Sequence, residues 1–149
     1  MYRLRVRISP KPARCWGIDQ KQKSSKAFRF LLTGSGKPIP VFGDGSTARD
    51  YTYVNDILDG IMACAEKKFG YEIFNLGESE TVKLSQLIEL LESALGKRAV
   101  LDRQPPQPGD VPLTCADISK ARTLLDYQPK TKIEQGIPLF VDWLRENPA

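Results

Sequence analysis

Residues 39–57 constrain the fold of this 149-residue chain more than any other stretch. They read Ile-Pro-Val-Phe-Gly-Asp-Gly-Ser-Thr-Ala-Arg-Asp-Tyr-Thr-Tyr-Val-Asn-Asp-Ile, so strand-forming residues precede a turn of the Gly-Asp-Gly-Ser type. Residues 49–54 then alternate polar and apolar side chains, which is typical of a half-buried strand. The pattern predicts a β-hairpin followed by a helix over 56–67 that Asn55 or Asp56 caps.

Arg49 is the most informative side chain of this stretch. A guanidinium that projects from a rigid hairpin beside a glycine-rich turn can hold a phosphate or a carboxylate through two parallel hydrogen bonds. The alternative is a surface arginine paired with Asp50 or Asp56, and such exposed ion pairs contribute little to stability. The spacing alone leaves both interpretations open.

Four motifs in a fixed order carry a family resemblance: the stretch just described, Tyr71-Glu-Ile-Phe-Asn-Leu-Gly77, Gln107-Pro-Gly-Asp-Val-Pro112 and Ala116-Asp-Ile-Ser-Lys-Ala121. Together they resemble the substrate-binding part of the NAD-dependent epimerase/dehydratase family, the extended short-chain dehydrogenase/reductases. The likeness is closest to the UDP-glucuronate 4-epimerases, which are isomerases, and it runs from about residue 28 to residue 146.

The resemblance implies an α/β fold: the carboxyl-terminal, substrate-binding part of an extended Rossmann-type epimerase, with the dinucleotide-binding half missing. The intact family interconverts C4 epimers of a nucleotide-sugar through a transient 4-keto sugar, with NAD as the cofactor. By the same resemblance, Arg49 would meet the diphosphate, Asp110 the ribose hydroxyls, and Gln107 would lie near the diphosphate. The uracil would lie beside the backbone of Val41, Phe42 and Gly43.

Two family motifs are absent from this sequence. No Gly-x-x-Gly-x-x-Gly loop for NAD occurs, and no tyrosine is followed by a lysine four positions later. We therefore assign no catalytic residue, expect no NAD to bind this chain alone and predict that it is inactive alone, as a truncated enzyme would be. The alternative function is a non-catalytic nucleotide-binding or protein-interaction fragment.

The distribution of charged residues changes at about residue 26. Residues 1–26 hold eight Lys/Arg and one acidic residue, whereas the rest of the chain is net negative. We predict a basic, poorly ordered leader over 1–26 and a nucleotide-sugar-binding portion over 27–149. The expected partners are a UDP-sugar and either a separate amino-terminal half or a second copy; neither a membrane nor nucleic acid is expected.

The cysteine and histidine content limits which catalytic and metal-binding chemistry the chain can support. The three cysteines are far apart in sequence and histidine is absent, so we expect no disulfide framework, no metal site and no imidazole base. Reduced thiols indicate a cytoplasmic protein.

Hydrophobic periodicity predicts the remaining elements. We expect a buried strand over 71–76, a core helix over 84–95, a short strand over 99–102 and helices over 118–126 and from about 133 to 144. Residues 104–110 form a stiff, proline-rich loop. Pro138 falls inside the last helix, where it removes one backbone hydrogen bond.

Overall fold

The computed structural model describes residues 38–146. These residues form two compact units. The first contains residues Arg49–Thr81 and Thr114–Ile133, and the second contains 38–48, Val82–Leu113 and 134–146. The leader predicted over 1–26 and the domain boundary at residue 26 lie outside the described residues, so both stay predictions.

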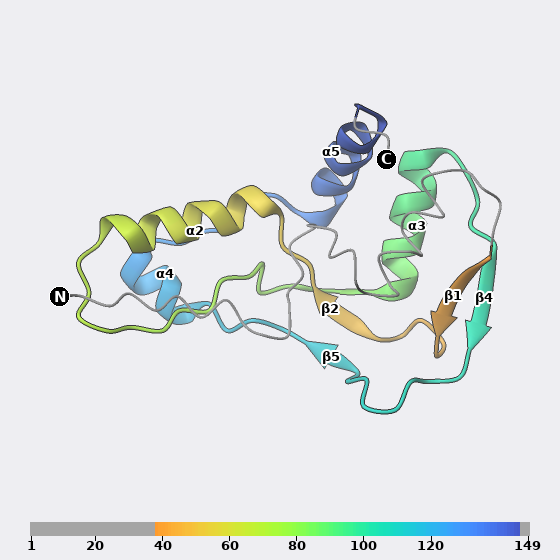
Figure 1. The fold of residues 1–149 in the computed structure, drawn as a ribbon, viewed down its shortest axis with the longest axis horizontal. Coiled ribbons are helices and arrows are strands. Elements are labelled where there is room, and N and C mark those ends of the chain that lie inside the picture. The colour runs from red at the N-terminus through yellow and green to blue at the C-terminus, as the bar shows by residue number, and fades with distance from the viewer. Residues whose placement is uncertain (1–37, 147–149) are drawn as a thin grey trace. The chain divides into compact units, whose positions relative to one another are not determined.

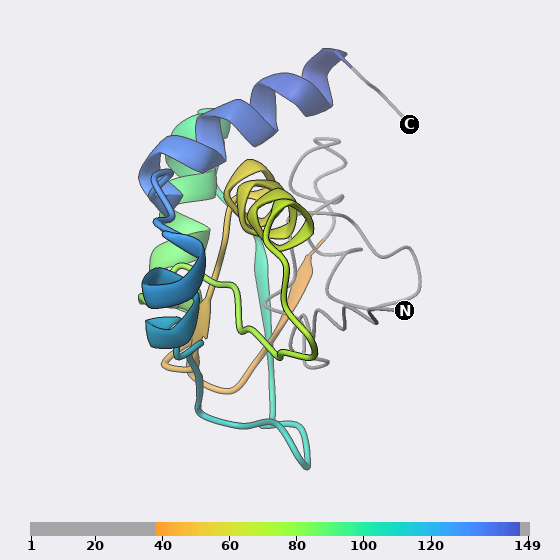
Figure 2. The same cartoon turned by 90° about the vertical axis from the view of Figure 1, so that its left-hand side faces the viewer.

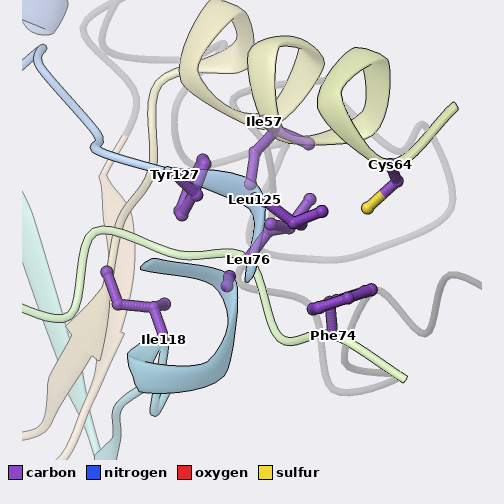
Figure 3. Packing of buried hydrophobic residues seen from close by; sticks show 8 residues of the cluster. Ile57, Cys64, Phe74, Leu76, Ile118, Leu125 and Tyr127 are labelled. Carbon is purple, nitrogen blue, oxygen red and sulfur yellow. The ribbon is translucent and has the colours of Figure 1, made fainter. Parts of the chain in front are cut away.

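The first unit is built on helix α2 (Val54–Glu66), a following extended segment and the short helix α4 (Ser119–Leu125). Figure 1 shows the chain leaving the end of α2 and returning beneath it, and Figure 2 looks nearly along α2 at the same arrangement. Figure 3 shows the core between these elements. It consists of Ile57, Cys64, Phe74, Leu76, Ile118, Ala121, Leu125 and Tyr127.

The second unit contains a parallel pair of strands and two helices. Strand β1 (Ile39–Phe42) pairs with β4 (Leu101–Gln104) in the register Ile39↔Leu101. A parallel pair needs a long crossover connection, which here includes α3 (Leu84–Leu95). Helix α5 (Ile133–Glu146) completes the unit, and Arg145 donates to the carbonyl of Ala94 at the end of α3.

Three short strands form a second sheet in the order β3-β2-β5, and the chain passes from one unit to the other within each of them. They are β2 (Ala48–Asp50), β3 (Thr81–Lys83) and β5 (Leu113–Thr114). The predicted hairpin is therefore wrong, because β1 pairs with β4 and β2 belongs to another sheet. The turn does form, with positive φ at Gly43 and Gly45, but its two glycines direct the chain away from β1.

The helices follow the apolar periodicity of the sequence. The predicted core helix is α3, and Gly96 ends it in the left-handed conformation. The last predicted helix is α5, with Pro138 inside it. The start of α2 differs from the prediction, because it begins at Val54 and has no side-chain cap.

The predicted strand over 71–76 is also wrong in one respect. Its side chains alternate in burial with a period of two, as in a strand, but residues 71–76 have no ladder partner among the described residues. A strand is defined by its hydrogen-bonded neighbour, and the part of the chain that the structure describes supplies none.

Gly60 allows the closest approach in the first core. A Cβ at this position of α2 would lie 2.7 Å from Leu76 Cδ2 and 3.0 Å from Tyr127 Cδ2. We expect Gly60→Ala to lower the free energy of unfolding by about 1–3 kcal/mol, because overpacking outweighs the roughly 1 kcal/mol gained in helix propensity. Urea unfolding measures this change. Gly70→Ala is the control, since its Cβ meets no atom within 4 Å, and a Gly60→Ala variant as stable as that control would contradict the tight packing.

Candidate functional site

Arg49 occupies the middle of β2, between two buried residues. Ala48 and Asp50 are buried and Arg49 is half-exposed. Because successive side chains of a strand point to opposite faces, Arg49 projects away from the face that carries Asp50. The face from which the Arg49 side chain leaves the strand therefore depends on what holds Asp50.

Asp50 is held by backbone N–H groups from two distant segments. Its Oδ1 accepts from Glu78 N at 2.9 Å, and its Oδ2 accepts from Ser79 N at 3.1 Å and from Ala116 N at 2.9 Å. The Thr52 hydroxyl adds a hydrogen bond to Oδ1 at 3.3 Å. Charged hydrogen bonds in a buried setting are strong, so this carboxylate fixes the end of β2.

Asp56 performs a similar task on the first turn of α2. Its two carboxylate oxygens accept from Lys130 N at 3.1 Å and from Thr131 N at 3.0 Å. Asp56 is buried, so it does not cap α2 as predicted; it anchors the segment that leads into α5. Both acids of the motif therefore have backbone partners far along the chain.

Glu78 is a buried acid that the sequence reasoning missed. Its side chain is 4% exposed, and its Oε1 accepts from Lys132 Nζ at 2.8 Å. Its Oε2 is buried and has no hydrogen-bond partner among the described residues. Burial raises the pKa of Glu78, and the nearby carboxylates of Asp56 and Asp50 add to the rise while Lys132 opposes it. The only sequence signal was an acidic residue directly after the apolar run that ends at Gly77.

Two neighbours of these buried acids also have raised pKa values. Lys132 is shared between Glu78 and the exposed Glu80, and these bonds raise its pKa. The Tyr127 hydroxyl donates to the carbonyl of Gly77 at 3.1 Å, and burial raises the pKa of this phenol. A phenol and an ammonium with raised pKa values keep their protons at neutral pH, so neither is a ready proton acceptor.

The second unit holds the other predicted site residues. Val41 is buried and Phe42 half-buried in β1, and Gly43 N donates to the carbonyl of Gln104 at 2.9 Å. Strand β4 occupies one edge of β1, and no described strand pairs with its other edge. The backbone of this strand is thus well fixed where the resemblance places the uracil.

Gln107 and Asp110 lie in one turn of the loop after β4. Asp110 N donates to the carbonyl of Gln107 at 3.1 Å, and Gly109 has a φ of 80°, which favours glycine. Both side chains are exposed. The structure therefore brings these two residues together within the second unit, whereas Arg49 belongs to the first.

No metal centre or membrane span is found in the described part of the chain. Within residues 38–146, no group of three or more His, Cys, Asp or Glu side chains is placed to hold a metal ion. None of the helices in that range is both long enough and apolar enough to cross a bilayer.

Comparison with known proteins identifies the family. The sequence model of the family described as GDP-mannose 4,6 dehydratase matches residues 20–139. The chain belongs to this family. That membership bears out the resemblance to the NAD-dependent epimerases and dehydratases and the α/β, extended Rossmann-type fold class.

Three relatives illustrate the likeness. The chain is 49% identical over 112 residues, 75% of its length, to an uncharacterized protein of Methanocaldococcus jannaschii. It is 46% identical over 122 residues, 80% of its length, to a UDP-glucuronate 4-epimerase of Thermodesulfobacterium geofontis. The crystal structure of UDP-glucuronic acid 4-epimerase from Bacillus cereus, in complex with UDP-glucuronic acid and NAD, matches with a TM-score of 0.74 and 32% identity over 85% of this chain.

The chain spans only part of these proteins. It covers 34% of the M. jannaschii protein, 38% of the T. geofontis protein and 40% of the B. cereus chain. The likeness therefore covers part of each relative, whereas the activity in a relative's name belongs to the whole protein.

Removing the Asp50 carboxylate should be costly. Asp50→Ala leaves the N–H groups of Ser79 and Ala116 without their acceptor, whereas Glu78 N keeps its bond to the Thr52 hydroxyl at 3.1 Å. At roughly 1–3 kcal/mol for each unsatisfied buried group, we expect a loss of at least about 2 kcal/mol in the free energy of unfolding, measured by urea titration. Asp44→Ala, which removes an exposed carboxylate bonded to Ser46, is the control and should cost less than about 1 kcal/mol. Equal stability of the two variants would show that Asp50 does not anchor β2.

The raised pKa of Glu78 predicts the sign of a pH effect. An acid whose pKa is higher in the folded state favours folding at low pH, and this contribution is lost as pH rises through the folded-state pKa. Glu78→Gln carries no titrating carboxyl. We therefore expect the stability of Glu78→Gln relative to the parent chain to increase between about pH 4 and pH 8.

Thermal or urea unfolding at several pH values measures this difference. Glu80→Gln is the matched control, because it removes an exposed ion pair with the same Lys132 but leaves the buried carboxyl in place. A stability difference for Glu78→Gln that is constant with pH would contradict the prediction.

Proposed function

We propose that this chain binds a UDP-sugar as the substrate-binding portion of an NAD-dependent sugar epimerase of the UDP-glucuronate 4-epimerase kind. The observation that carries the proposal is the anchoring of Asp50, because it fixes β2 and directs Arg49 to the opposite face. A planar guanidinium carried by a fixed strand suits the bidentate recognition of a phosphate. The B. cereus relative was crystallised with UDP-glucuronic acid, which supports this ligand class.

The other predicted contacts follow from the chemistry of the same ligand. Asp110 is an exposed carboxylate in a turn closed by its own backbone N–H, and a carboxylate accepts hydrogen bonds from the two ribose hydroxyls. Gln107 presents a neutral amide near the diphosphate. The backbone of Val41, Phe42 and Gly43 lies in a paired strand and offers a rigid surface beside the uracil.

The chemistry of the intact relatives would come from their cofactor. NAD bound to an intact enzyme would supply the hydride chemistry at the sugar C4, and the protein would bind and orient the sugar. We assign this chain the binding role alone, because the glycine loop and the Tyr-x-x-x-Lys pair are absent from its sequence.

Titration calorimetry of the full 149-residue chain with UDP and with UDP-glucuronic acid tests the proposal. Hydrogen bonds to charged groups contribute roughly 1.5–3 kcal/mol, so Arg49→Ala should weaken binding about tenfold to a hundredfold. Arg49→Lys should recover only part of this loss, because an ammonium cannot present the planar fork. Asp110→Ala should cost less, because it removes bonds to neutral hydroxyls.

Arg98→Ala is the matched control for the arginine. The side chain of Arg98 is 91% exposed and is bonded to Glu92, so its removal should leave the affinity unchanged. Equal affinities of the parent chain and Arg49→Ala would remove Arg49 from the site. No measurable binding of either nucleotide by the parent chain would overturn the proposed function.

A further inference from the structure

The loop before β3 supplies backbone groups that hold Asp50, and it packs tightly against that side chain. We call residues 77–79 the anchoring loop. Glu78 N donates to Asp50 Oδ1 at 2.9 Å and to the Thr52 hydroxyl oxygen at 3.1 Å. A Cβ at Gly77 would lie only 2.9 Å from Asp50 Oδ2. The anchoring loop therefore has little room to move without disturbing Asp50.

Glu78 joins this backbone contact to a buried side chain of its own. The side chain is 4% exposed, and its Oε1 accepts from Lys132 Nζ at 2.8 Å. Its Oε2 is buried and has no hydrogen-bond partner in the described part of the chain. A buried carboxylate oxygen without a donor is less favourable as an anion than as a neutral acid. The surroundings of Oε2 therefore favour a proton on Glu78.

Titratable groups face Glu78 from several elements of the first unit. They are Asp50 on β2, Asp56 on α2, Tyr127 after α4 and Lys132 before α5. The two aspartates disfavour a further negative charge, the phenol is neutral, and Lys132 favours the charge but is shared with Glu80. Burial and the aspartates outweigh the ammonium, so the pKa of Glu78 is raised.

Few other groups of the chain titrate in the same range. Histidine, whose ordinary pKa would fall there, is absent. The shifted carboxyls of Asp44, Glu92 and Asp117 have lowered pKa values, and the two cysteines of the described range have thiol pKa values raised by burial. A change in nucleotide affinity between about pH 5 and pH 8 that disappears when Glu78 is replaced would therefore report on this one carboxyl.

We propose that Glu78 is a positioning residue of the nucleotide site, and that binding of the nucleotide diphosphate at Arg49 is coupled to the uptake of a proton from solvent by the Glu78 carboxylate. Glu78 acts through Asp50, the neighbour of Arg49 in β2, and not by contact with the ligand. This inference rests on the proposed function and deepens it, because it adds a titrating group behind the phosphate contact.

Two effects give this coupling the same sign. A ligand that requires β2 in its anchored position favours the arrangement in which Glu78 is buried beside Asp50, and this arrangement favours the protonated acid. The negative charge of the ligand also disfavours another buried anion. The bound chain therefore has the higher Glu78 pKa. Affinity is greatest below the pKa of the free chain and falls as pH rises through the pKa of the bound chain.

Titration calorimetry of the full 149-residue chain with UDP-glucuronic acid tests the coupling. This ligand is preferred to UDP because its diphosphate is esterified at both ends, whereas a terminal phosphate titrates near about pH 6. If binding raises the Glu78 pKa by about one unit, the dissociation constant should rise about tenfold between about pH 5 and pH 8. Repeating the titration midway, in buffers of different ionisation enthalpy, should show proton uptake by the parent chain and none by Glu78→Gln.

Glu78→Gln separates a titrating role from a merely structural one. Glutamine keeps the shape of the protonated acid and cannot ionise, so we expect the parent affinity at pH 5 to persist to pH 8. A structural role alone would lower the affinity by the same factor at every pH. Glu80→Gln is the matched control, because it removes an exposed carboxylate bonded to the same Lys132 and should keep the parent's pH dependence. Equal pH dependence of the parent chain and Glu78→Gln would overturn the inference.

Lys132→Met should move the pH dependence in a defined direction. The ammonium lowers the pKa of Glu78, so its removal should raise that pKa further and shift the fall in affinity to higher pH. A fall at the same or a lower pH would count against the coupling.

A measurement on the parent chain keeps the inference testable even if a variant does not fold. NMR of the Glu78 carboxyl carbon, assigned through its own backbone, follows the protonation of this group directly. We expect its titration midpoint to lie about one pH unit higher with saturating UDP-glucuronic acid than without it. An unchanged midpoint would overturn the inference.

Failure of this inference can be told apart from failure of the proposed function. Binding of UDP-glucuronic acid without a pH dependence that belongs to Glu78 would overturn the coupling and leave the proposed function in place. No binding at any pH would overturn the proposed function, and the coupling with it.

Discussion

Three backbone N–H groups converge on the buried carboxylate of Asp50, and the first unit depends on this convergence. The donors come from residues 78–79 and from residue 116, so one side chain ties β2 to the loop before β3 and to the approach to α4. Asp56 ties the start of α2 to residues 130–131 in the same way. Loops of this kind have no neighbouring strand whose carbonyls accept from their backbone N–H groups. A carboxylate that accepts from several of these N–H groups takes the place of that strand.

The burial of these acidic groups costs free energy. Asp50, Asp56 and Glu78 are all buried within one unit, and the pKa of Glu78 is raised by burial and by the two aspartates. Ser79 also adopts a positive φ of 60°, which is uncommon for a residue other than glycine. Backbone strain and a carboxylate oxygen without a partner in the described region lie at adjacent positions. Such features persist only where surrounding contacts fix them, and here the Asp50 bonds to residues 78 and 79 do so.

The sequence correctly predicted the structural elements that depend on local periodicity. Helices α3 and α5 follow from apolar residues at helical spacing, and Gly96 ends α3 as its conformational freedom suggests. The family and its fold class followed from four motifs in order. Of the six predicted site residues, three lie in strands and three in turns or loops, and their contacts with a ligand remain predictions.

What the sequence could not show depends on distant partners. A Gly-Asp-Gly-Ser turn between two strands is compatible with a hairpin, and only the pairing of β1 with β4, some sixty residues away, excludes it. The roles of Asp50 and Asp56 likewise depend on N–H groups far along the chain, which no local pattern reveals. Glu78 gave almost no signal, because its burial is set by packing and by Lys132.

The segment of residues 71–76 is a further case in which the local sequence does not decide the pairing. Its sequence has the composition and alternation of a strand, and its burial follows that alternation, yet the described residues contain no ladder for it. Local preference specifies an extended conformation, but a sheet also requires an edge to pair with.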